Sequence, residues 1–409
     1  MPRIERIYHY VLIAFCGLWL LLKALAGPLL IVLMILALIG NRKQENQFKL
    51  TKLSWPWIAF FVLYAFSLFW ALTPDAAVLE RKLAFIALPL LFTFQWKNPV
   101  PIAKMWLAHT LACLVLIAIA YYDAIMCQLT LGNSVRCFST TYFSQVHHPS
   151  YFSAFLIFSV IGLLFQKIAW FAEKPRWVSW ILITLFTFMH FHLGTLAGII
   201  ALVVVFVAYI SSSLSKSWGL LRSLSTGLAL FIIGVSLALQ SPEIKADALN
   251  AFGFTKNFIA KPNEFVQSRK EPLQGNELRL ILWTASIQEV VAHPFGLGLG
   301  GMEAALKSKL IAWGYPQQAQ KEFNPHNQFL QVCNEIGLLG LLLLCFILFR
   351  FFRKAIFQKA KASILFATVF LVFCIFESML QRESGIVFFL CWFCAFESNW
   401  FNYPSSETT

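Results

Sequence analysis

The chain has 409 residues, and its composition excludes a water-soluble globular protein. Apolar residues make up 59% of it and charged residues only 12%, with 42 phenylalanines and a formal net charge of +13. Soluble domains carry about twice that share of charged residues, which they need to cover their surface. We therefore predict an all-α polytopic membrane protein.

Twelve apolar runs are long enough, or nearly so, to cross a bilayer as helices. In chain order they are 8–24, 26–40, 54–72, 83–96, 103–123, 150–166, 177–193, 195–211, 219–240, 327–349, 364–380 and 386–402. The first run is expected to be a retained span, because no small-residue cleavage site follows it. The chain then divides into transmembrane helices 1–9 (1–240), a polar loop (241–325) and transmembrane helices 10–12 (326–409).

Basic residues predict the orientation. With the N-terminus inside, the inner segments hold 18 Lys and Arg, whereas the short outer loops hold Arg81, Lys82, Arg136 and Arg382. Both termini are then cytoplasmic and the long loop lies on the periplasmic face of a bacterial inner membrane. The net charge is explained by topology and by anionic lipid, so no nucleic-acid partner is expected.

Two outer features stand out from the loops around them. Residues 241–324 contain helical periodicity, as in LRLILWTASIQEVVAH, and loops of this length in compact proteins are usually lids or binding elements. No ATP is available on that face, so a reaction there must use an activated substrate already in the membrane. Cys127 and Cys137 share another outer loop, where they either form a disulfide or remain thiols.

The stretch FNPHNQFLQVCNEIGLLG predicts a helix that begins at the outer membrane surface. Asn324 is expected to cap it and Pro325 to occupy its first position. At 100° per residue, His326 shares a face with Gly337, and Gly340 lies near it, so a second helix is expected to approach closely there. His326 and Asn327 would then be presented at the interface. The alternative is that both are ordinary interfacial residues.

His326-Asn327, nine residues and then Gly337-Leu-Leu-Gly340 resemble the signature of the O-antigen ligase and polymerase superfamily. ELRLILWTASIQEVVAHPFGLGLGG resembles the family's Arg-X-X-X-Trp helix and Gly-X-Gly turn. VHHPSYFSAF and ESMLQRESGIVFF are similar to segments of ligase-like proteins of Bacteroidetes-type bacteria. The resemblance covers the whole chain, although only 279–340 is specific.

The resemblance implies a C-type glycosyltransferase architecture that works without a divalent metal or a cofactor. An acceptor hydroxyl would displace undecaprenyl diphosphate from a lipid-linked glycan. The expected acceptor is lipid A core, as in an O-antigen ligase of lipopolysaccharide biosynthesis. A polymerase or a protein O-oligosaccharyltransferase of the same superfamily is the alternative, and a polytopic transporter of lipid-linked glycan is a minority reading.

Residue roles follow from the same resemblance. His326 is the expected base and Arg279 the expected phosphate ligand, both counted as catalytic. Substrate binding is expected from Asn327, Trp283, Arg382, His148 and Arg269. The alternatives are a structural cation–π pair for Arg279 and Trp283, a salt bridge of Arg382 with Glu377 or Glu383, and a solvated face for Arg269. In one departure, Leu196 stands where the family carries a second Arg.

Overall fold

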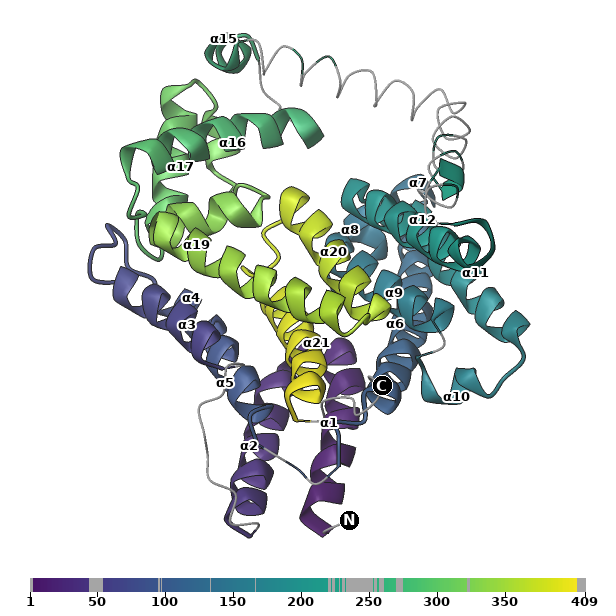
Figure 1. The fold of residues 1–409 in the computed structure, drawn as a ribbon. Coiled ribbons are helices and arrows are strands. Elements are labelled where there is room, and N and C mark those ends of the chain that lie inside the picture. Colours follow the sequence, from purple (N-terminus) through teal and green to yellow (C-terminus); the bar gives the residue numbers. More distant parts are fainter. Residues whose placement is uncertain are drawn as a thin grey trace.

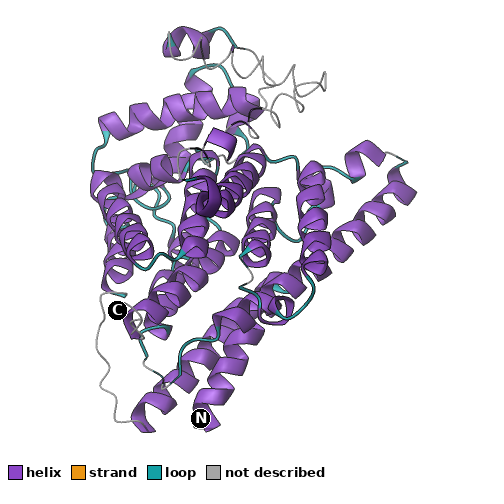
Figure 2. Cartoon of the chain, turned by 45° about the vertical axis from the view of Figure 1, so that its right-hand side comes forward, coloured by secondary structure: helices purple, strands orange, loops and turns teal. Residues whose placement is uncertain are grey.

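The computed structural model is helical throughout the part of the chain that it describes (Figure 2). That part comprises residues 3–43, 54–94, 96, 98–132, 134–165, 167–219, 261–269, 275–321 and 324–402, with isolated positions at 222, 225–227, 229, 232, 253 and 256. Most of the predicted ninth span lies outside the described residues. The same holds for much of the predicted loop before residue 275.

The N-terminal half contributes a hairpin and then a succession of long and short helices. Their bounds are α1 Arg3–Leu21, η1 Lys23–Leu25, α2 Ala26–Lys43, α3 Trp55–Ser67, α4 Ala76–Arg81, α5 Ala84–Leu91, α6 Ile102–Leu131, α7 Ser134–Cys137, α8 Thr140–Phe143, α9 Pro149–Leu164, α10 Ala169–Ala172, α11 Arg176–Leu193 and α12 Leu196–Trp218. The 3-10 turn between α1 and α2 confirms that the first two apolar runs are separate helices.

The C-terminal half contains the loop helices and three further apolar helices. Their bounds are α15 Pro262–Gln267, α16 Gly275–Ala292, α17 Gly301–Ala312, α18 Pro316–Ala319, α19 Gln328–Phe357, α20 Lys361–Phe376 and α21 Glu383–Asn402. In Figure 1, α16 and α17 lie above α19, at the end of the molecule opposite the N-terminal hairpin.

Five of the described helices are long and apolar enough to cross a membrane: Arg3–Leu21, Lys23–Gly40, Ile102–Leu131, Leu196–Leu214 and Gln328–Phe357. Shorter apolar helices run over Trp55–Ser67, Pro149–Leu164 and Lys361–Phe376. The expected twelve spans are thus shown only in part. The predicted span 83–96 contains a helix of only 8 residues, which at 1.5 Å per residue reaches less than halfway across a hydrocarbon core.

The core is built around α9 and is rich in aromatic rings. Every side chain of α9 is buried, and α6, α11, α12 and α20 pack around it. The Phe158 ring stacks on Trp106 at 4.4 Å and lies 4.5 Å from Trp392. Phe370 and Phe389 stack between α20 and α21. These rings hold α9, α20 and α21 at fixed positions, which matters because the segment before α9 and the connection between α20 and α21 carry residues of the site.

The glycine-rich turn after α16 docks into a break in α19. Ile336 and Gly337 leave the helical conformation, and the carbonyl groups of Asn334 and Glu335 accept hydrogen bonds from Leu297 (2.7 Å) and Gly298 (3.1 Å). The Leu338 N–H donates to the Pro294 carbonyl at 2.9 Å. These three bonds replace helical ones lost at the break, so the turn and the kink stabilise each other.

The expectation that a second helix approaches closely at Gly337 and Gly340 is therefore wrong. Gly337 has φ +73°, and a Cβ there would lie 2.5 Å from the Phe295 carbonyl carbon, so its close neighbour is a turn and not a second helix. At Gly340 the nearest atoms belong to side chains of the same helix, Ile336 and Val332. A larger residue would thus be excluded at Gly337 by the backbone of the turn and at Gly340 by side chains of α19 itself.

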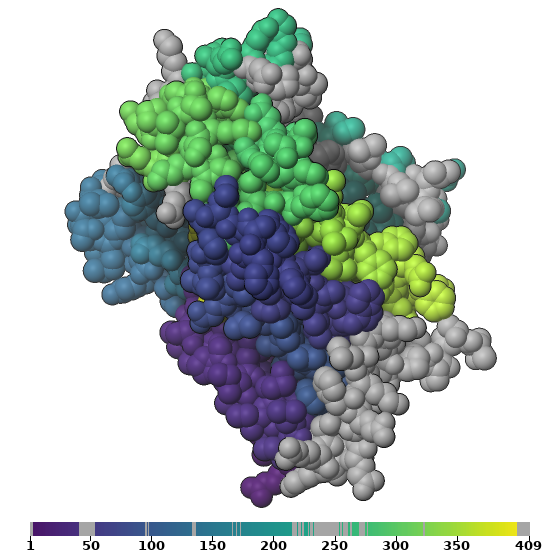
Figure 3. Space-filling view, turned by 90° about the vertical axis from the view of Figure 1, so that its left-hand side faces the viewer, coloured from purple at the N-terminus to yellow at the C-terminus, as the bar shows by residue number. Residues whose placement is uncertain are grey.

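The same turn also contacts the connection between α3 and α4. Trp70 Nε1 donates to the Gly296 carbonyl at 3.2 Å, and Thr73 Oγ1 donates to the Gly300 carbonyl at 2.8 Å. The Asp75 N–H donates to the Leu299 carbonyl at 3.2 Å. The space-filling view shows the α3–α5 region directly below α16 and α17 (Figure 3). The loop helices are thus fixed to the apolar bundle at two places.

Candidate functional site

The helix that follows the His-Asn pair begins later than its sequence predicts. Asn327 is the N-cap, and its Oδ1 accepts hydrogen bonds from the N–H groups of Phe329 and Leu330, both at 3.0 Å. The expectation that Asn324 caps and that Pro325 opens the helix is wrong. Both Asn residues have the right chemistry for a cap, and tertiary contacts of Asn324 decide between them.

His326 therefore precedes the helix and adopts an unusual backbone conformation, with φ +46°. The Asn324 Oδ1 accepts a hydrogen bond from the His326 N–H at 2.9 Å, and Trp283 Nε1 donates to the Pro325 carbonyl at 2.8 Å. A non-glycine residue at positive φ needs such support, since the conformation is strained. Trp283 thus ties α16 to the turn that carries His326.

The imidazole of His326 is paired with a carboxylate. Its Nδ1 lies 3.0 Å from Glu377 Oε1. Glu377 follows α20 as its C-cap, and its other oxygen, Oε2, accepts a hydrogen bond from Ser150 Oγ at 3.2 Å. This geometry makes Nδ1 the protonated nitrogen and leaves Nε2 of the neutral ring as a base.

The surroundings of Glu377 keep it ionised. Burial by itself would raise the pKa of Glu377, but the hydrogen bond from His326 and the charges of His326, His148 and Arg279 outweigh it and lower the pKa to about 2. An ionised carboxylate in this position stabilises a protonated His326 imidazole. The pair is therefore built to accept a proton at Nε2.

Cationic and imidazole side chains from four parts of the chain surround this pair. His148 Nδ1 lies 3.9 Å from Glu377 Oε2, and Arg279 interacts electrostatically with Glu377. The charge of Arg382 also acts on His148. Arg382 is exposed and is the last residue before α21. The structure thus brings together His326, Arg279 and His148 around Glu377, with Arg382 close enough to His148 to act on its charge.

The surroundings of His148 favour its neutral form. Burial lowers its pKa, and although the Glu377 charge raises it, Arg382, His326 and Arg279 lower it further. Its Nδ1 accepts a hydrogen bond from the Ser150 N–H at the start of α9, at 3.4 Å. Nε2 then carries the ring proton and is a hydrogen-bond donor for a substrate oxygen.

A comparison with known protein families finds a match for part of the chain. Residues 180–345 match the family described as O-Antigen ligase. This segment is therefore similar to an O-antigen ligase domain. The similarity suggests an enzyme of the glycosyltransferase type that acts on lipid-linked glycans, at the level of reaction class. No curated protein matches the chain.

The matched segment contains only part of the candidate site. Arg279, Trp283 and His326 lie within residues 180–345. His148 and Glu377 lie outside it and are brought to it by the packing of α9 and α20. One sequence signal pointed to Glu377: it is a carboxylate next to an apolar span, which is costly unless it has a function or a partner. Its pairing with His326 was not predicted.

Other predicted site residues take different positions. Arg269 lies on Phe265, with Nε 3.5 Å from Glu277 Oε1, away from the Glu377 group. Asn327 is used as the cap, and its Nδ2 donates to the Ile375 carbonyl at 3.2 Å. Within the described ranges, Arg382 forms no ion pair with Glu377 or Glu383, so the predicted salt bridge is absent there. Leu196 is the first residue of α12 and is exposed.

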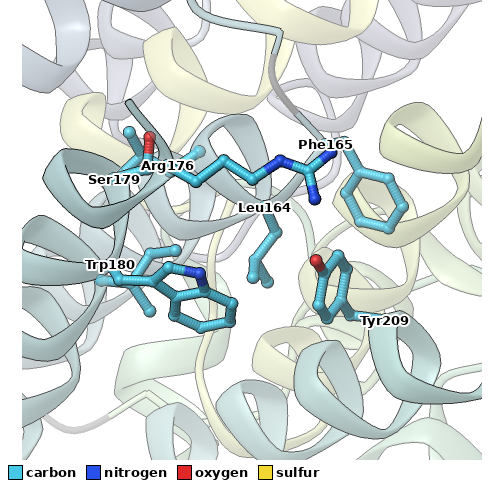
Figure 4. A pocket seen from close by; sticks show the side chains of 8 residues that line it. Leu164, Phe165, Arg176, Ser179, Trp180 and Tyr209 are labelled. Atoms are coloured by element: carbon cyan, nitrogen blue, oxygen red, sulfur yellow. The ribbon is translucent and has the colours of Figure 1, made fainter. Parts of the chain in front are cut away.

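Three features lie outside the group of residues around Glu377 or concern the described chain as a whole. Cys127 and Cys137 are joined in a disulfide, with Cα atoms 5.6 Å apart. No group of three or more His, Cys, Asp or Glu residues in the described part of the chain is placed to hold a metal ion. A cavity of about 130 Å³ lies elsewhere, where Arg176, Trp180 and Tyr209 face one space (Figure 4).

Proposed function

We propose that the protein is a metal-independent glycosyltransferase of the O-antigen ligase type. It moves a glycan from undecaprenyl diphosphate to a hydroxyl of lipid A core, on the periplasmic face of the bacterial inner membrane. The observation that carries this proposal is the His326–Glu377 pair, with Nδ1 and Oε1 3.0 Å apart and with Arg279 beside it.

The pair supplies the base. The acceptor oxygen attacks the anomeric carbon, and its proton passes to His326 Nε2 while a new glycosidic C–O bond forms. The bond between the anomeric carbon and the diphosphate oxygen breaks, and its electron pair leaves with undecaprenyl diphosphate. Glu377 orients the imidazole and stabilises the imidazolium that results.

Cations of the site serve the leaving group. A diphosphate gains negative charge as its bond to the sugar breaks, and a preorganised guanidinium stabilises that charge. Arg279 is half-buried beside the pair and Arg382 is exposed nearby, so Arg279 is the phosphate ligand next to the reacting bond. The family carries a second Arg at the position that Leu196 occupies here. Arg382 takes over its role as a phosphate ligand, and His148 Nε2 donates a hydrogen bond to the same phosphate.

The alternatives differ in the acceptor. A polymerase would extend the lipid-linked glycan itself, and a protein O-oligosaccharyltransferase would use Ser or Thr of a protein. Both need the same base and the same phosphate ligand, so the His326–Glu377 geometry fits them equally. A transporter needs neither a base nor its carboxylate partner, which makes transport the weakest of the readings.

Reconstitution tests the proposal. Purified protein in liposomes is given an undecaprenyl-diphosphate oligosaccharide and lipid A core, with EDTA present. We expect glycosylated core from wild type and from His293→Ala, a control in which an exposed loop histidine is removed. His326→Ala and Arg279→Ala are expected to be inactive. A lengthened lipid-linked glycan with bare core would show a polymerase, and no transfer to any hydroxyl acceptor would overturn the proposal.

A further inference from the structure

A lysine that the sequence places in a short outer loop is fully buried in the structure. Lys82 follows α4 with an exposed fraction of 0%. Its Nζ lies 3.5 Å from Glu335 Oε2, 3.1 Å from Gln381 Oε1 and 4.1 Å from the centre of the Tyr64 ring. A buried ion pair is weak evidence for stability, because desolvation offsets its attraction. Another role must explain it.

The contacts of Lys82 lead to the site through an unbroken set of polar groups. Gln331 Nε2 donates to Glu335 Oε1 at 2.8 Å, and Ser378 Oγ lies 3.3 Å from Gln331 Oε1. Ser378 Oγ also lies 3.2 Å from Asn324 Oδ1, which holds the His326 N–H. Ser378 is the residue after Glu377. Both members of the His326–Glu377 pair are thus attached to this network.

Lys82 also holds the segment 377–381 from its far end. The Gln381 side chain accepts the Lys82 hydrogen bond, and the Leu380 N–H donates to Gln328 Oε1. The Ser378 carbonyl accepts a hydrogen bond from Tyr151 OH at 3.3 Å. This segment connects α20 to α21 and carries Glu377 at its first position. Its conformation therefore depends on α4, α9 and α19 together.

Glu335 contacts both Lys82, which holds the 377–381 segment, and the turn that follows α16. Its side chain pairs with Lys82, and its backbone carbonyl accepts the Gly298 N–H at the break in α19. One residue thus fixes both the 377–381 segment and the turn that follows α16. We infer that Lys82 is a positioning residue, which acts through Glu335 and Gln381 to set the geometry of the His326–Glu377 pair. The inference rests on the proposed function for its kinetic readout only.

The test compares two buried ion pairs on the same helix. Lys82→Met, Glu335→Gln and the double variant remove the first pair. Arg350→Met with Glu397→Gln removes the second, whose atoms Nη2 and Oε2 lie 2.8 Å apart between α19 and α21. The hydrogen bonds and the ion pair between Arg350 and Glu397 involve none of residues 377–381. This pair is therefore the matched control. The double variants also leave no unpaired buried charge, which keeps the proteins foldable.

Three quantities are measured: the melting temperature in detergent, kcat and KM for glycan transfer, and the pH titration of the ¹⁵N-labelled His326 ring. We expect the Lys82 and Glu335 variants to lower kcat by about 10- to 100-fold, with little change in KM, because small displacements of a base have effects of that size. The His326 titration should shift, and Lys82→Arg should recover most of the rate. The control pair should change the melting temperature alone.

Two results would overturn the inference. One is an unchanged His326 titration in the Lys82 variants. The other is an equal loss of kcat in the Arg350 and Glu397 control, which would mean that any buried pair has this effect. If wild type transfers no glycan, the proposed function fails, yet the titration of His326 still decides whether Lys82 positions it.

Discussion

At the scale of single residues, the site depends on a strained backbone and a carboxylate. His326 has φ +46°, a conformation that costs on the order of 1–3 kcal/mol and persists only when its surroundings determine it. The Asn324 side chain, the Trp283 indole and Glu377 supply those surroundings. The strain directs the ring toward Glu377 and away from the helix that follows. Chemistry and conformation are thus set by the same contacts.

Glu377→Gln should remove most of the catalytic rate. The amide can still receive a hydrogen bond from His326 Nδ1, but it has no charge with which to stabilise the imidazolium. We expect kcat to fall by about 10²- to 10⁴-fold, the range associated with general-base catalysis. Steady-state kinetics in liposomes measures it. Glu264→Gln, an exposed carboxylate on the loop helix α15, is the control, and an unchanged kcat in Glu377→Gln would exclude the pair from the mechanism.

The pKa of Glu377 also predicts a pH dependence of stability. Its pKa is lowered from 4.5 to about 2 in the folded protein. A lowered carboxyl pKa contributes stability that is fully present above the unfolded value and is lost as pH falls through the folded value. The contribution, about 3 kcal/mol, should therefore decline between pH 4.5 and pH 2. Thermal unfolding of wild type and Glu377→Gln should show a difference that shrinks across this window.

At the scale of elements, the break in α19 couples the loop helices to the apolar bundle. The break leaves backbone groups unpaired inside the protein, and the turn 294–298 satisfies them. Unsatisfied backbone groups are costly wherever water is excluded, so neither element is stable in this form alone. Glycine is required at the break because of its positive φ and the proximity of the turn.

Gly337→Ala should separate the turn from the helix. The added Cβ would meet the Phe295 backbone at 2.5 Å and would be strained at φ +73°. We expect the free energy of unfolding to fall by about 1–3 kcal/mol. Hydrogen exchange should accelerate at the amides of Leu297, Gly298 and Leu338.

Gly27→Ala is the matched control for that variant. A Cβ at Gly27 meets nothing within 4 Å, and the residue lies in α2. Alanine is favoured over glycine inside a helix by about 0.5–1 kcal/mol. The control should therefore be unchanged or more stable, and a Gly337→Ala protein that behaved in the same way would show that the turn does not depend on the kink.

At the scale of the whole molecule, the orientation in the membrane is a prediction from basic residues. His293 lies in the long loop with an exposed side chain, and Lys359 is exposed between α19 and α20. We expect a membrane-impermeant maleimide to label His293→Cys in intact spheroplasts. Lys359→Cys should be labelled only after lysis. The opposite pattern would reverse the topology and place the site on the cytoplasmic face, and a protein with neither substitution is the background control.

The sequence by itself predicts the class of protein and the central residues of the candidate site. Apolar content and periodicity predict helices because these depend on composition and local pattern, and the order of Arg279, Trp283 and His326 lies within one segment. Only the tertiary structure shows which side chains surround His326. Glu377, Lys82 and Gln381 reach His326 through contacts between distant helices, and no local pattern encodes such pairing. The same reason explains the cap: Asn324 and Asn327 both satisfy the local rule, and only the contact of Asn324 with Ser378 and His326 distinguishes them.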